Sequence, residues 1–143
     1  MLYDKILVAV DGSEHSNRAL KEALRVAQFA NSTITLIHVY PQDPSSSTLI
    51  SATQQFNRIL KDSGKTVLER AQKLVAEECE VVNIEALELE GDAAEQIIQT
   101  AKDGKYNLIV LGARGVNKLS GLILGSVSQG VVKNAPCPVL IVK

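Results

Sequence analysis

The sequence has no tryptophan, two cysteines, two histidines and almost no excess charge of either sign. Two cysteines, Cys79 and Cys137, are too few for a disulfide framework or a cysteine-rich zinc site, so we expect both to pack as small apolar side chains. His15 and His38 lack the cysteine or glutamate spacing of a metal site. An aromatic content of 3% also disfavours a flavin carrier, whose ring needs aromatic side chains to stack on.

The charge and hydropathy patterns exclude further classes. The formal net charge is −1 and no long basic run occurs, so a nucleic-acid groove or a membrane-binding face has no electrostatic support. No apolar run approaches the roughly 20 residues that span a bilayer. Residues 1–5 lead directly into a strand pattern and lack the layout of a signal peptide. We therefore expect a cytoplasmic protein that binds neither nucleic acid nor membrane.

Apolar strand patterns alternate with amphipathic helix patterns along all 143 residues. The spacing predicts strands over 6–10, 33–39, 81–89, 107–111 and 139–142, and helices over about 13–30, 52–78, 93–102 and 126–134. Gly64 weakens the second helix pattern. In the third strand we expect Val82, Ile84, Ala86 and Leu89 to pack against the core.

This alternation predicts an α/β fold, a doubly wound five-stranded parallel sheet with helices on both faces. Right-handed crossovers leave few topologies, and we predict the strand order 3-2-1-4-5. The sequence contains no internal repeat and no second domain, so residues 1–143 are expected to form one domain.

A glycine pattern follows the fourth strand. Gly112 and Gly115 come directly after it, and nine residues later Gly125 precedes the helix that starts Ser126-Val127-Ser128. Glycines let backbone N–H groups approach a ligand closely, and a helix N-terminus adds unpaired donors with a partial positive charge. The pattern therefore favours a phosphate-binding site over its alternative, a tight turn with a glycine-serine cap. Arg114 either contacts phosphate or is solvated, and both remain open.

Two strand ends meet the glycine pattern at the expected switch point between strands 1 and 4, where such sheets bind ligands. Asp11 ends the first strand, where it can accept ribose hydroxyls, approach phosphates through a divalent cation, or cap the next helix. Taken alone, the residue favours the cap. Val39 ends the second strand, where its backbone can read an adenine edge or simply pack. His38 is interpreted as a hydrogen-bonded histidine at the sheet end and not as a base.

Motifs for rapid chemistry are missing from the sequence. The loop has no P-loop lysine, no G-x-S-x-G elbow occurs, and Asp11-Gly12-Ser13-Glu14 is not a dinucleotide fingerprint. No nucleophile stands with a base, and no pair of carboxylates is placed as acid and base. The sequence therefore indicates nucleotide binding more than nucleotide turnover.

Three segments resemble the universal stress protein family over essentially the whole chain. They are the opening 3–13, the glycine pattern from Leu111 to Ser128, which matches the ATP-binding subgroup, and the close 135–142. The resemblance implies an adenine nucleotide alpha hydrolase-like fold, a homodimer, ATP in the crevice and a role in stress response. It assigns the base to Ala9 and Val39, the ribose to Asp11, and the ribose and phosphates to the glycine pattern: Gly112, Gly115, Gly125, Ser126, Val127 and Ser128.

The favoured function is therefore a regulatory protein in which ATP acts as a conformational ligand. Because no lysine is placed to neutralise the terminal phosphates, we expect ATP to bind with Mg²⁺ or Mn²⁺, with Asp11 as a candidate neighbour of the metal. The alternatives are a slow ATPase and a nucleotide-free interaction module. The apolar edge strand 139–142 predicts a homodimer through paired edges, and a regulatory protein partner is expected but not identified.

Overall fold

The computed structural model describes residues 2–42, 50–79, 82–114 and 124–143, and these form a parallel sheet flanked by helices. The sheet order is β3-β2-β1-β4-β5, which confirms the predicted fold. The elements are β1 (Lys5–Ala9), α1 (Glu14–Ala30), β2 (Thr33–Tyr40), α2 (Ile50–Glu78), β3 (Asn83–Glu90), α3 (Ala93–Asp103), β4 (Leu108–Gly112), α4 (Ser126–Asn134) and β5 (Val139–Val142).

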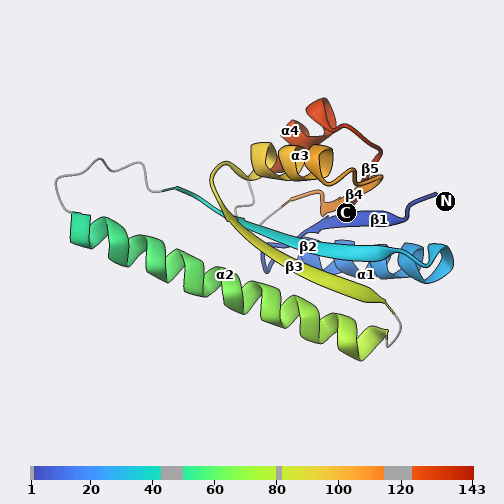
Figure 1. Cartoon of the computed structure of the whole chain (residues 1–143), viewed down its shortest axis with the longest axis horizontal. Coiled ribbons are helices and arrows are strands. Elements are labelled where there is room, and N and C mark those ends of the chain that lie inside the picture. The colour runs from blue at the N-terminus through green and yellow to red at the C-terminus, as the bar shows by residue number, and fades with distance from the viewer. Residues whose placement is uncertain (1, 43–49, 80–81, 115–123) are drawn as a thin grey trace.

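The helices form two layers, one on each face of the sheet. Helices α1 and α2 lie on one face, and α3 and α4 lie on the other (Figure 1). Successive residues of β1 point to opposite faces, so Ile6 and Val8 join the core under α1 and α2, whereas Leu7 joins the core under α3 and α4. The middle strands β1 and β4 are mostly apolar because both of their faces are covered.

The third strand differs from its prediction. It runs over Asn83–Glu90 rather than 81–89, and the expected packing of Ala86 is wrong, since this residue is exposed. Val82, Ile84 and Leu89 do pack, each partly buried against one of the two cores. As an edge strand, β3 has a neighbouring strand on one side only, and the helices cover it incompletely.

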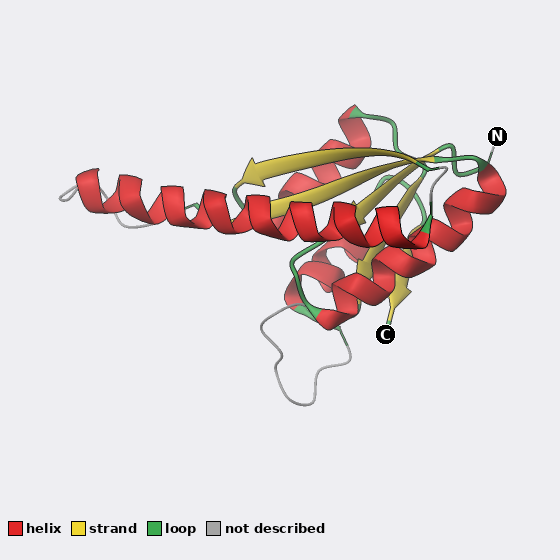
Figure 2. Cartoon of the chain, turned by 90° about the horizontal axis from the view of Figure 1, so that it is seen from below, coloured by secondary structure: helices red, strands yellow, loops and turns green. Residues whose placement is uncertain are grey.

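Gly64 does not interrupt α2, which continues from Ile50 to Glu78 and is seen along its length in Figure 2. A Cβ atom at this position would lie 2.7 Å from Cδ2 of His38 and still closer to Oε2 of Glu88. The glycine therefore lets the helix backbone pack directly on the ends of β2 and β3. This close approach explains a residue that otherwise lowers helix propensity.

Both cysteines pack as expected. Cys79 lies against the core under α1 and α2, and Cys137 lies against the core under α3 and α4. Each is partly buried, and burial raises the pKa of the Cys137 thiol. A raised thiol pKa lowers the thiolate fraction at neutral pH and so lowers the reactivity of Cys137.

Candidate functional site

A cavity of about 350 Å³ lies at the carboxyl ends of β1, β2 and β4. After β1 the chain enters α1 on one face of the sheet, and the helix that follows β4 is α4, on the opposite face. Helices leaving in opposite directions open a crevice between the two strands. The volume falls within the range of small-molecule sites, about 300 to 1,000 Å³.

The structure brings the sequence-predicted residues together around this cavity. Its lining includes Ala9, Asp11, Val39, Gly112, Arg114, Gly125, Ser126, Val127 and Ser128. Gly115, the remaining predicted residue, lies outside the described residues. Segments separated by more than a hundred residues thus form one site, as the switch-point argument expects.

The cavity also has an apolar wall that sequence reasoning missed. Ile37, Ala93, Ile97 and Leu111 line it together with Ala9 and Val39. Ile97 is 2% exposed and belongs to the inward face of the amphipathic helix α3. That amphipathic pattern predicted burial but not a ligand. An apolar wall of this kind suits a flat aromatic group such as a nucleobase.

The N-terminus of α4 differs from the other helix starts that the structure describes with a cap. Ser13 caps α1 by accepting from the Ser16 N–H at 3.1 Å, and Asp92 caps α3 by accepting from the Glu95 N–H at 3.0 Å. Gly125, the N-cap of α4, has no side chain to donate or accept. Among the described residues, no side chain accepts from the first N–H groups of α4, which lie beside the cavity that Ser126 and Val127 line.

Gly125 has an ordinary backbone conformation, with φ −71° and ψ 170°. Any residue can adopt these angles, so conformation does not require glycine here. Its N–H donates to the Ala113 carbonyl at 2.8 Å, and its carbonyl accepts from the Gln129 N–H at 3.0 Å. These two bonds fix the start of α4 against the end of β4.

Ser128 serves this junction with its side chain. Its buried hydroxyl donates to the Gly112 carbonyl at 2.7 Å, and the Ala113 carbonyl lies 3.2 Å away. The hydroxyl therefore ties α4 to the end of β4. Only the backbone N–H of Ser128 belongs to the group of helix-start donors.

Gly112 has a packing role that the sequence did not reveal. A Cβ atom there would lie 2.8 Å from both the carbonyl carbon and Cβ of His15, and 2.9 Å from its carbonyl oxygen. The backbone of α1 thus rests directly on the end of β4. Glycine at this position is required by the fold, whether or not a ligand approaches it.

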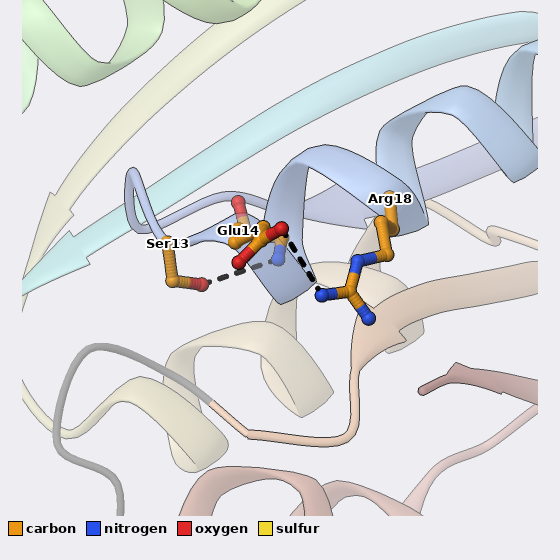
Figure 3. A network of polar contacts seen from close by, with 4 residues as sticks. Ser13, Glu14 and Arg18 are labelled. Atoms are coloured by element: carbon orange, nitrogen blue, oxygen red, sulfur yellow. Dashed lines mark hydrogen bonds and ion pairs between the residues drawn. The ribbon is translucent and has the colours of Figure 1, made fainter.

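Asp11 organises the turn between β1 and α1 but does not cap the helix. Its Oδ1 accepts from the Ser13 N–H at 2.9 Å, and its own N–H donates to Ser16 Oγ at 3.2 Å. Ser13 is the cap, and the neighbouring Glu14 carboxylate lies 3.3 Å from the Arg18 guanidinium on the exposed side of α1 (Figure 3). Ser16 holds the Asp11 backbone from within the first helical turn.

Metal ligands do not cluster in the described ranges: no group of three or more His, Cys, Asp or Glu side chains there is placed to hold an ion. Of the described residues that line the cavity, Asp11 supplies a carboxylate and Arg114 supplies a cation. A metal at this site would therefore need most of its ligands from a bound molecule or from water.

Comparison with known proteins agrees with this geometry. The model of the Universal stress protein family matches residues 2–143. A universal stress protein of Thermus aquaticus is 37% identical, over 99% of this chain and 100% of the relative. The structure of universal stress protein UspA from Lactobacillus plantarum superposes with a TM-score of 0.91 at 28% identity, covering 100% of this chain and 99% of that one.

Two similar structures are nucleotide complexes. A universal stress protein in complex with cAMP has a TM-score of 0.77 at 25% identity, covering 100% of this chain and 99% of that chain. The universal stress protein from Archaeoglobus fulgidus in complex with dAMP has a TM-score of 0.73 at 25% identity, with 100% of both chains covered. Within the described part of this chain, no helix combines the length and apolar character needed to cross a membrane.

Proposed function

This chain belongs to the universal stress protein family, and on that premise we propose that it binds ATP in the crevice between β1 and β4 as a regulatory ligand. The adenine base would lie against the apolar wall near Ala9 and Val39, and the phosphates would lie at the start of α4. The cAMP and dAMP complexes of similar proteins support an adenine nucleotide in this fold. ATP rather than a monophosphate is our own extension of that observation.

The observation that carries the proposal is the glycine start of α4 beside the cavity. Gly125 provides no side-chain cap and has no conformational need to be glycine. A bare helix start with its partial positive charge is suited to a phosphate group. Neither a tight turn nor a helix cap explains the choice of glycine over serine at this position, since serine caps helices at least as well.

A divalent cation would complete the charge balance of the bound nucleotide. Arg114 is the one cationic side chain among the described residues that line the cavity, against several negative charges on a triphosphate. Asp11 would then face the phosphates only through Mg²⁺ or Mn²⁺, since a carboxylate alone repels them. We therefore propose that ATP binds as its metal complex, with Asp11 near the ribose or the metal.

Regulation would follow from assembly. β5 is an edge strand, and Leu140 on it is 36% exposed while Val132 on the adjacent α4 is 49% exposed. An apolar edge invites pairing, and a two-fold axis limits that pairing to two chains. Helix α4 contributes both to the proposed phosphate site and to this exposed surface. Nucleotide bound at the phosphate site can therefore shift the equilibrium between monomer and dimer. We propose a homodimer joined through β5, which presents a surface to a regulatory protein.

Titration calorimetry with ATP and Mg²⁺ tests the proposal. The wild-type protein should bind one ATP per chain, and Gly125→Val should bind none while keeping its circular dichroism spectrum. Gly125→Ala is the matched control for side-chain size, and its affinity for ATP should lie between those of wild type and Gly125→Val. A folded Gly125→Val variant that binds ATP as wild type does would make this glycine structural only. Chromatography of the nucleotide after a long incubation separates stable binding from slow hydrolysis.

A further inference from the structure

At the end of the ladder between β1 and β2, a side chain takes the place of a backbone hydrogen-bond donor. Residues Lys5–Ala9 pair with Thr33–Ile37, and the last ladder bond runs from the Val10 N–H to the Ile37 carbonyl at 2.9 Å. In a parallel ladder the next bond would run from the Val39 N–H to the Val10 carbonyl. Here Nδ1 of His38 lies 2.8 Å from that carbonyl oxygen, and no backbone bond joins Val39 to β1 in the described structure.

The turn after β1 explains why the ladder does not continue past Val10. Gly12 has a positive φ of 84°, and the Asp11 N–H donates to Ser16 Oγ, which directs the chain toward α1. β1 therefore diverges from β2 beyond Val10. No bond from the Gly12 N–H to the Val39 carbonyl is present among the described residues. Both backbone groups of Val39 are thus left without a ladder partner on this side.

These groups of Val39 point toward the crevice. The N–H and C=O groups of a strand residue lie on the same side in a parallel sheet, and the side alternates along the chain. Ile37 accepts from β1, whereas Tyr40 accepts from Gly91 beyond the end of β3. Val39, two residues after Ile37, therefore faces the β1 side, where it lines the cavity.

We propose that His38 is a positioning residue that keeps the Val39 backbone open to read the edge of adenine, an inference that rests on the proposed function. A carbonyl oxygen only accepts, so the proton lies on Nδ1 of His38, which donates to Val10. This bond takes the place of the one that would consume the Val39 N–H. The open N–H and C=O then match the N1 acceptor and the N6 amino donor of adenine, and mismatch the N1 donor and O6 acceptor of guanine.

Packing from α2 and β3 holds the imidazole in place. The backbone of α2 at Gly64 lies over the ring, where a Cβ atom would be 2.7 Å from its Cδ2. Glu88 is the register partner of His38 on β3, and its Oε2 borders the same point of α2. Helix α2 thus contacts the histidine that sets the end of β2, so the position of α2 is coupled to the base site.

Amide hydrogen exchange in the ligand-free protein tests the claim without any nucleotide. The Val39 amide should exchange at least tenfold faster than that of Ile37, which lies inside the ladder. His38→Leu frees the Val10 carbonyl, so the ladder bond forms and Val39 exchange slows toward that of Ile37. His38→Asn, whose amide nitrogen replaces Nδ1, should leave Val39 open. A slow Val39 amide in wild type, or an unchanged rate in His38→Leu, would overturn the inference.

Calorimetry with ATP and 1-deaza-ATP, which lacks the N1 acceptor, tests the consequence for selectivity. Wild type and His38→Asn should bind ATP roughly tenfold more tightly than 1-deaza-ATP, which is the effect of one net hydrogen bond. His38→Leu should lose most of this preference while still binding 1-deaza-ATP like wild type. An equal preference in wild type and His38→Leu contradicts the role. If wild type binds neither compound, the proposed function fails, and the exchange rates still decide the role of His38.

Discussion

The two glycines that begin and end the loop between β4 and α4 are expected to respond differently to the same substitution. At Gly112 an added Cβ would lie 2.8 Å from the carbonyl carbon and Cβ of His15. These atoms belong to the first turn of α1 and cannot rotate away. Overpacking of this kind costs about 1–3 kcal/mol, so Gly112→Ala should destabilise the fold by that amount.

At Gly125 the backbone angles suit any residue, and the glycine supplies no side-chain hydrogen bond. Replacing this N-cap glycine by alanine should therefore cost less than about 1 kcal/mol of folding stability. The substitution should instead weaken ATP by roughly tenfold, equivalent to about 1.4 kcal/mol of binding free energy, because the methyl group stands at the helix start that the phosphates approach.

Thermal unfolding of the two alanine variants distinguishes these roles. For a chain of this size, about 1 kcal/mol corresponds to roughly 3 °C in Tm, so Gly112→Ala should melt about 3–9 °C below wild type. Gly125→Ala should melt within about 3 °C of wild type in the absence of nucleotide and should gain less Tm on addition of ATP. A Gly112→Ala variant as stable as wild type would refute the packing argument, and an undiminished ATP-induced shift in Gly125→Ala would refute the ligand argument.

Three further predictions concern the metal, the ribose side and assembly. Removing divalent cations with EDTA should weaken ATP binding measured by calorimetry, and equal affinity with and without EDTA would remove the metal requirement. Asp11→Ala should lose about 1 kcal/mol of stability through its turn bond to Ser13 and a larger share of ATP affinity; lost stability with unchanged affinity would leave only the turn role. Sedimentation at micromolar concentration should show two chains for wild type and a shift toward one for Ile141→Lys, and a monomeric wild type would exclude the β5 interface.

Much of the fold follows from the sequence because each signal is local. Continuous apolar runs marked the covered strands, and the amphipathic spacing of α1 and α3 marked their buried faces. The prediction that Ala86 packs against the core was wrong because a single apolar residue in a strand does not reveal whether that strand lies at an edge. Gly64 made a continuous helix look less favourable in the sequence. The close contacts that require glycine there are with His38 and Glu88, which are far from Gly64 in the sequence.

The site was predictable where topology alone determines it. Asp11, Val39 and Gly125 end or begin elements at the switch point, so the strand order brings them together. A hydrogen-bonded His38 was expected, but the partners of side-chain hydrogen bonds were not predictable in the same way. The Ser128 hydroxyl bonds to the end of β4, and His38 bonds to Val10, because tertiary packing places these groups within reach.

An amide NMR titration of the isotope-labelled wild-type protein with ATP and Mg²⁺ tests the central claim most directly. The account predicts large, saturable changes at Val39 and at Ser126–Ser128, with one ATP per chain and little change at the opposite end of the sheet around Lys5 and Thr33. A spectrum that ATP leaves unchanged, or changes confined to residues away from the crevice, would contradict an adenine nucleotide site between β1 and β4.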